Sequence, residues 1–177
     1  LFEVKQKLDA ISFSDPECAE KKAFYKGCIC SLEAAIRFQE RYHEQAVKLY
    51  EQEQSPERKK ELEHMVAALE NVPKNPARNF REALQMFRIL HFSMWLEGNY
   101  HNTVGRFDKY MYPYLKADME KGLYTEETAL EMVEDFFLSF NKDSDIYVGV
   151  QQGDNGQSMM LGGIDEQGNE VFNLLTE

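Results

Sequence analysis

Three cysteines and four histidines are the side chains of this sequence best suited to metal binding or nucleophilic chemistry. Cys28 and Cys30 are two residues apart, and on a helix such side chains point about 200° from one another, so they cannot share a metal ion. The histidines show none of the spacings typical of zinc ligands. We therefore expect no metal site, buried cysteines with a structural role, and a core position for His91 with a hydrogen bond to a neighbouring residue.

A polar loop at residues 97–103 is the other candidate for chemistry. It follows residues 79–96, whose side chains are apolar on nearly all sides and predict a buried helix. The loop therefore emerges from the interior with polar side chains, which must be hydrogen-bonded either to the protein or to a ligand. Both alternatives stay open from the residues alone.

The glycine-rich stretch at residues 149–163 has neither of the glycine spacings that cradle a phosphate in front of a helix. We expect a loop there, with a short buried strand near residues 158–161. Residues 165–169 have the composition of a turn, and residues 171–175 that of a helix start.

The charge balance limits the partners, because 31 acidic against 20 basic residues leave a formal net charge of −11. Nucleic acids and anionic membrane surfaces both require basic patches, so neither is expected. No apolar run reaches the roughly 20 residues of a membrane span. The sparse, odd number of cysteines favours a reducing compartment, and we expect a soluble, cytoplasmic protein.

Apolar periodicity and cap residues predict five helices, over residues 16–54, 56–71, 79–96, 105–121 and 126–140. A loop with the short strand follows over residues 141–169. The expected fold is mainly α, in one partial domain over residues 1–177. Because the chain opens on Leu1 and stops at Glu177 within an apolar run, we expect an internal piece of a longer protein.

Five short segments occur in a fixed order: NFREALQ at 79–85, EGN at 97–99, GRFD at 105–108, YPY at 112–114 and LGG at 161–163, followed by Asp165 and Gly168. Each is unspecific alone, but their order and spacing resemble the pyruvate formate-lyase domain of glycyl radical enzymes. The resemblance implies that the chain is the helical part of a ten-stranded α/β barrel.

The resemblance also implies the chemistry of an anaerobic enzyme in which a glycyl radical generates a thiyl radical on a cysteine. The reaction is cleavage of a carbon–carbon bond, acyl transfer, or elimination from a small organic substrate. A separate radical S-adenosylmethionine activase installs the radical. The glycine motif R-V-x-G-Y is absent here, and relatives carry the catalytic cysteine on a later loop. We therefore expect an isolated chain without catalytic residues or a cofactor, and without activity.

Partners implied by the resemblance are the rest of the polypeptide, a second copy in a homodimer, the activase and a small organic substrate. In relatives the polar loop helps line the substrate pocket, often through a His-Ser pair. The corresponding candidates here are Glu97, Asn99, His101 and Asn102. The residues expected to have a structural role are Gly105, Arg106, Asp108, Gly162 and Gly163. The alternative function is a non-catalytic helical interaction or scaffold domain.

Overall fold

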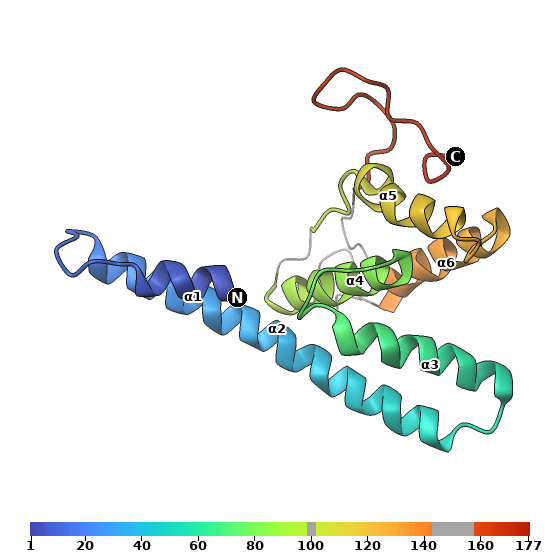
Figure 1. The fold of residues 1–177 in the computed structure, drawn as a ribbon, viewed down its shortest axis with the longest axis horizontal. Helices are drawn as coiled ribbons and strands as arrows, with labels where there is room; N and C mark the ends of the chain where they lie inside the picture. The colour runs from blue at the N-terminus through green and yellow to red at the C-terminus, as the bar shows by residue number, and fades with distance from the viewer. Residues whose placement is uncertain (99–101, 143–157) are drawn as a thin grey trace, which may run out of the picture. The chain divides into compact units, whose positions relative to one another are not determined.

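The computed structural model describes residues 1–98, 102–142 and 158–177, and these are mainly helical (Figure 1). The helices are α1 (Phe2–Asp9), α2 (Cys18–Gln52), α3 (Pro56–Asn71), α4 (Phe80–Leu96), α5 (Phe107–Glu120) and α6 (Glu126–Leu138), and the 3-10 helix η1 (Ser139–Lys142) follows α6. The chain divides into two compact units, Leu1–Lys74 and Asn75–Glu177. None of the helices in these described ranges is long and apolar enough to cross a membrane.

The first unit consists of α2 with α3 and α1 packed along it (Figure 1). Helix α3 begins where the sequence predicts, since the Ser55 hydroxyl accepts a hydrogen bond from the Arg58 amide and Pro56 occupies the first turn. The side chain of Gln39, on α2, is almost fully buried and donates to the main-chain oxygen of Leu69 on α3. Helix α1 has no counterpart among the helices expected from the sequence.

The expectation of buried cysteines is wrong. Cys18 and Cys28 are only half-buried, and Cys30 is exposed. The physical reason is that α1 and α3 cover only part of the surface of α2. Because Cys28 and Cys30 point to different sides of that helix, one packed face cannot bury both.

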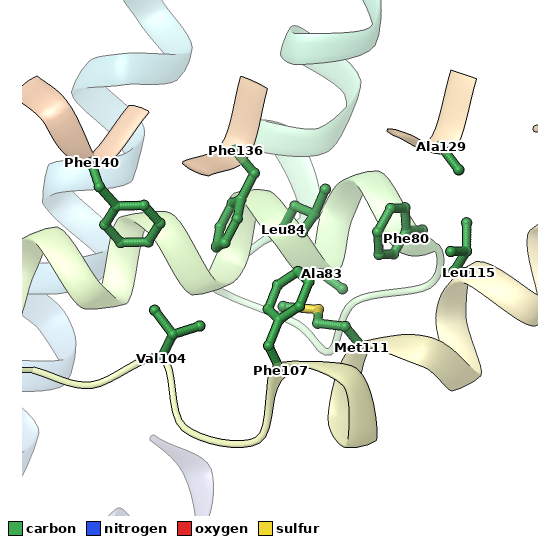
Figure 2. Close-up of a cluster of buried hydrophobic side chains, with 10 residues drawn as sticks. All are labelled: Phe80, Ala83, Leu84, Val104, Phe107, Met111, Leu115, Ala129, Phe136 and Phe140. Carbon is green, nitrogen blue, oxygen red and sulfur yellow. The ribbon is translucent and has the colours of Figure 1, made fainter. Parts of the chain in front are cut away.

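The second unit is built on an apolar core between α4, α5, α6 and the turn before α5 (Figure 2). Its buried members are Phe80, Ala83, Leu84, Val104, Phe107, Met111, Leu115, Ala129, Phe136 and Phe140. The Phe107 and Phe136 rings stack with centroids 5.4 Å apart. Val104 and Phe107 flank the Gly105-Arg106 turn, so the core fixes this turn on both sides.

Helix α4 is less enclosed than its composition predicts. Its first turns are buried, but Met94 and Leu96 in its last turn are 46% and 56% exposed. Only one face of the helix meets α5 and α6. The expectation of burial on nearly all sides is therefore wrong for the end of α4 that leads into the polar loop.

The expected strand at residues 158–161 is not formed. Met159 makes a single parallel bridge to Gly105, and a second isolated bridge pairs Ile164 with Glu170. A strand needs successive bridges along a partner, whereas the partner segment turns into α5 immediately after Gly105. On the other side, Gly162 has a left-handed backbone conformation (φ 68°), which ends the extended segment.

Residues 173–176 form a turn with the reciprocal hydrogen bonds of a helix start. The Asn173 side chain accepts from the Leu175 amide at 2.9 Å, and the Thr176 hydroxyl accepts from the Asn173 amide at 3.1 Å. The pattern resembles a capping box, except that the Asn173 side chain binds the amide of the second residue of the turn rather than the third. The expected first helical turns at residues 171–175 form only as this turn.

Candidate functional site

The polar loop begins with a turn of the main chain that ends α4. Amides of Glu97 and Gly98 bond to the carbonyl oxygens of Met94 and Trp95 at 3.2 and 3.0 Å, and Gly98 takes a left-handed conformation (φ 85°). The Glu97 side chain is exposed. The candidate residues Asn99 and His101 lie outside the described residues.

The loop returns to the core at Asn102, where side chains from two helices hold its main chain. The Nε2 atom of His91, on α4, lies 3.0 Å from the carbonyl oxygen of Asn102. The hydroxyl of Tyr110, on α5, donates to the carbonyl oxygen of Val104 at 2.6 Å. Burial raises the pKa of the Tyr110 hydroxyl, so it remains a hydrogen-bond donor at neutral pH.

His91 is a core residue, as expected from the sequence. Only 1% of it is exposed, and its ring stacks on Phe87 and meets the edge of Phe140. A carbonyl oxygen can only accept, so the Nε2 atom must carry the proton of the bond to Asn102. The predicted hydrogen bond of His91 to a neighbour is confirmed.

The segment after residue 157 holds the same end of the loop from another direction. The Val104 amide donates to the Ser158 carbonyl oxygen at 3.0 Å, and the Met160 amide donates to the Gly105 carbonyl oxygen at 2.9 Å. These two bonds form the parallel bridge. The returning end of the loop is thus joined to a segment more than 50 residues away in sequence.

Beside this bridge, Arg106 and Asp108 bind both sides of one residue, Gly162. The carboxylate of Asp108 accepts from the Gly162 amide at 2.6 Å, and the guanidinium of Arg106 donates to the Gly162 carbonyl oxygen at 2.6 Å. Arg106 also donates to the carbonyl oxygen of Ile164 at 2.8 Å. A Cβ atom on Gly163 would lie 3.8 Å from the same guanidinium. We call Arg106, Asp108 and Gly162 the clamp.

Asp108 is fully buried and also binds the residues beyond the turn. Its carboxylate accepts from the Thr176 hydroxyl at 2.8 Å, and its carbonyl oxygen accepts from the Asn173 side chain at 3.2 Å. The carboxylate oxygen Oδ1 has no hydrogen-bond partner within the part of the chain that the structure describes. The contacts of the clamp therefore reach the helix-start turn at residues 173–176.

The turn that begins at Asp165 is exposed and held by its own polar groups, as the sequence predicts. The Asn169 side chain and amide hydrogen-bond to the Asp165 carboxylate and hold its pKa below the usual range. Lys109, on α5, pairs with Glu166 at 2.5 Å and lowers the pKa of that carboxyl. The turn is thereby tied to α5 at the surface.

The structure brings together all five residues that the sequence assigned a structural role, namely Gly105, Arg106, Asp108, Gly162 and Gly163. Of the substrate candidates it places Glu97 at the surface and Asn102 half-buried. No group of acidic, histidine and cysteine side chains within the described ranges could hold a metal ion.

Sequence reasoning missed Tyr110 and Thr176. For Tyr110 no local signal exists, since its spacing fits any amphipathic helix. For Thr176 the signal was present, because Asn173 and Thr176 have the three-residue spacing of a capping box.

The family model described as pyruvate formate lyase-like matches residues 2–177 of this chain. The chain is 35% identical to a (2S)-3-sulfopropanediol dehydratase of Klebsiella oxytoca over 176 residues, covering 96% of this chain and 21% of that protein. It is 32% identical to an isethionate sulfite-lyase of Bilophila wadsworthia over 183 residues, covering 98% and 22%.

Among solved structures, the glycerol-bound form of the B12-independent glycerol dehydratase of Clostridium butyricum is similar with a TM-score of 0.91. The sequence identity is 26%, and the match covers 99% of this chain and 23% of that one. These matches define the class as a mainly helical part of a glycyl radical enzyme, spanning about a fifth of the length of its relatives.

The chain belongs to the pyruvate formate lyase-like family of glycyl radical enzymes. The resemblance carried by the five short sequence segments is thereby confirmed.

Proposed function

We propose that this chain is part of a glycyl radical enzyme that eliminates water or another leaving group from a small organic substrate. The proposal is supported by the relatives, since two are a dehydratase and a sulfite-lyase and the similar solved structure is a glycerol dehydratase. We therefore propose elimination in preference to carbon–carbon cleavage and acyl transfer.

Within such an enzyme, the chain supplies helical support for a ten-stranded barrel and one loop that lines the substrate pocket. The candidates for substrate contact are Glu97, Asn99, His101 and Asn102. Geometry supports this role for the loop, because its returning end lies against the buried core at Val104 and His91. Arg106, Asp108 and the glycines that they contact have a structural role.

The radical glycine and the thiyl cysteine belong to other parts of the protein in this proposal. The chain has no R-V-x-G-Y motif, and its three cysteines lie within α2, half-buried or exposed, rather than in the unit that carries the loop. The partners are a radical S-adenosylmethionine activase, the remaining polypeptide and a second copy in a homodimer. The proposed location is the anaerobic cytoplasm.

The observation that carries the proposal is the family match over residues 2–177. The test uses the natural protein at its full encoded length, activated anaerobically with its activase. We expect a glycyl radical doublet in electron paramagnetic resonance and elimination from a member of a panel of small diols, hydroxysulfonates and hydroxyamino acids. The isolated 177 residues are expected to show neither.

Two results contradict the proposal. Absence of the doublet despite a competent activase favours the alternative, a non-catalytic scaffold domain. A doublet accompanied by acetyl transfer, without elimination, contradicts the proposed reaction class while leaving the family intact.

The role of the loop has its own test in the same protein. Asn102→Ala is expected to lower kcat/KM at least tenfold with an undiminished radical signal, since a lost polar substrate contact acts on recognition and not on activation. Glu120→Ala, an exposed change on α5, is the control and leaves kcat/KM unchanged. Equal kinetics for both variants would remove Asn102 from the substrate site.

A further inference from the structure

We infer that His91 and Tyr110 are positioning residues, which hold the main chain at the returning end of the loop, at Asn102 and Val104, so that the Asn102 side chain meets the substrate in one arrangement. This inference rests on the proposed function, because it gives the loop a substrate to recognise. It adds two residues from the neighbouring helices to the candidates in the loop itself.

The hydrogen bonds that hold the returning end of the loop bind its main-chain atoms. The bonds at the returning end of the loop use the carbonyl oxygens of Asn102, Val104 and Gly105 and the amide of Val104. None of these four bonds uses a side chain of residues 102–105. The path of the loop therefore depends on its neighbours, whereas the side chains at these positions can vary without losing these anchors.

His91 provides the anchor from α4. Its position is set by tight aromatic packing, with centroids 5.6 Å from Phe87 and 4.9 Å from Phe140. A buried ring held on two sides has little rotational freedom, so its Nε2–H points at the Asn102 carbonyl in a fixed direction. Displacing this donor would leave a carbonyl at the loop end without that partner.

Tyr110 provides the anchor from α5. Its ring stacks on Phe87 with centroids 6.0 Å apart, and Phe87 is the same ring on which His91 stacks. One side chain of α4 thus orients both donors. The Val104 side chain is itself 5% exposed and belongs to the core, so the Tyr110 bond fixes a residue that is already packed.

The expected change in KM depends on the fraction of molecules in which the loop takes the path that binds substrate. If a lost anchor lets the loop visit other paths, only a fraction of molecules presents the competent one, and the apparent substrate affinity falls by that fraction. The loss of one hydrogen bond corresponds to about a fivefold change in an equilibrium. A fivefold shift in that equilibrium lowers the competent fraction by less than fivefold, so we expect KM to rise about two- to threefold with kcat unchanged, because the reacting groups are elsewhere.

The principal test is Tyr110→Phe in the full-length, activated enzyme. This change removes the hydroxyl and keeps the ring contacts with Phe87 and Phe107. The matched control is Tyr114→Phe, one turn further along α5, whose ring packs on the core but whose hydroxyl makes no hydrogen bond among the described residues. We expect the rise in KM in the first variant only, with equal radical signals and equal melting temperatures.

The second test compares two substitutions of His91. His91→Phe keeps a ring between Phe87 and Phe140 and removes the donor, whereas the amide of Gln in His91→Gln can place a donor near the position of Nε2. KM is expected to rise in His91→Phe and to return toward the wild-type value in His91→Gln. A role in packing alone would give the opposite order, because Phe preserves the ring and Gln does not.

Hydrogen exchange of the peptide covering residues 102–106 gives a readout that is independent of turnover. We expect faster exchange in Tyr110→Phe and His91→Phe, but not in Tyr114→Phe. Unchanged exchange would overturn the anchoring. Faster exchange with unchanged KM in a radical-bearing enzyme would overturn the positioning role and leave the proposed function standing. Absence of the radical in the wild-type enzyme refutes the proposed function, and this inference falls with it.

Discussion

Replacement of Asp108 by alanine is the most direct test of the clamp. In the folded protein this carboxylate accepts from the Gly162 amide at 2.6 Å and from the Thr176 hydroxyl at 2.8 Å, and Asp108 has no exposed surface. Alanine would leave the buried Gly162 amide without an acceptor, which costs about 1–3 kcal/mol, and would remove the bond to Thr176, which is worth about 1 kcal/mol. Relief of the buried charge offsets part of this loss.

The expected result for Asp108→Ala is a decrease of about 2–3 kcal/mol in the free energy of unfolding. Asp108→Asn keeps an oxygen of similar geometry for the Gly162 amide, so its loss should be about 1 kcal/mol. The assay is urea unfolding of the chain followed by the fluorescence of Trp95, the single tryptophan, which lies in the second unit. Amide exchange at Gly162 is measured in parallel.

The control is Asp135→Ala, which removes an exposed carboxylate near the end of α6 and should change the free energy by less than about 0.5 kcal/mol. Equal unfolding free energies for Asp108→Ala and the wild-type chain would refute the reasoning. So would unchanged protection of the Gly162 amide, because the clamp would then not hold that group.

Two further predictions concern other carboxylates. Asp118 is 1% exposed, and its carboxylate accepts from the Phe80 amide at the start of α4 at 2.8 Å. Asp118→Ala should therefore lower the free energy of unfolding by about 1–2 kcal/mol, whereas the exposed change Glu120→Ala should have little effect. Equal urea midpoints for the two variants would contradict this prediction. Lys109 lowers the pKa of Glu166 below the ordinary 4.5, so the stabilisation from this pair is present above that value and is lost as the pH falls through the lowered pKa. Lys109→Met should raise the Glu166 pKa in a carbon-13 titration and Lys116→Met should not, and an unshifted titration in Lys109→Met would show that the pair does not form.

Local sequence signals located the starts of α3 and α6, because helix caps depend on nearby residues, whereas α1 was not predicted. The Ser55 side chain caps α3 by accepting from the Arg58 amide, and the Thr125 side chain caps α6 by accepting from the Thr128 amide. Each bond joins residues only three positions apart. The burial of His91 was also predictable, since its apolar neighbours lie on the same helix. The exposed position of Cys30 was not, because periodicity gives the face of a helix but not which face is covered.

The strand near residue 159 illustrates a second limit. Four apolar or small residues in a row are compatible with a buried strand, but strand formation depends on a partner that runs alongside. Here the partner is Gly105, and the helix that starts at Phe107 leaves room for one bridge. A competing element in the partner segment, rather than the propensity of residues 158–161, decided the outcome.

By itself, the sequence determined the mainly helical character of the chain and, through its five ordered segments, its membership of the pyruvate formate lyase-like family. The pairing of Arg106 and Asp108 with Gly162, and of His91 and Tyr110 with the loop, was decided only by tertiary structure. Asp108 and its partners Gly162 and Thr176 are 54 and 68 residues apart. Periodic sequence patterns do not predict contacts over such separations in sequence, because hydrogen bonds between remote segments depend on how the apolar core brings those segments together.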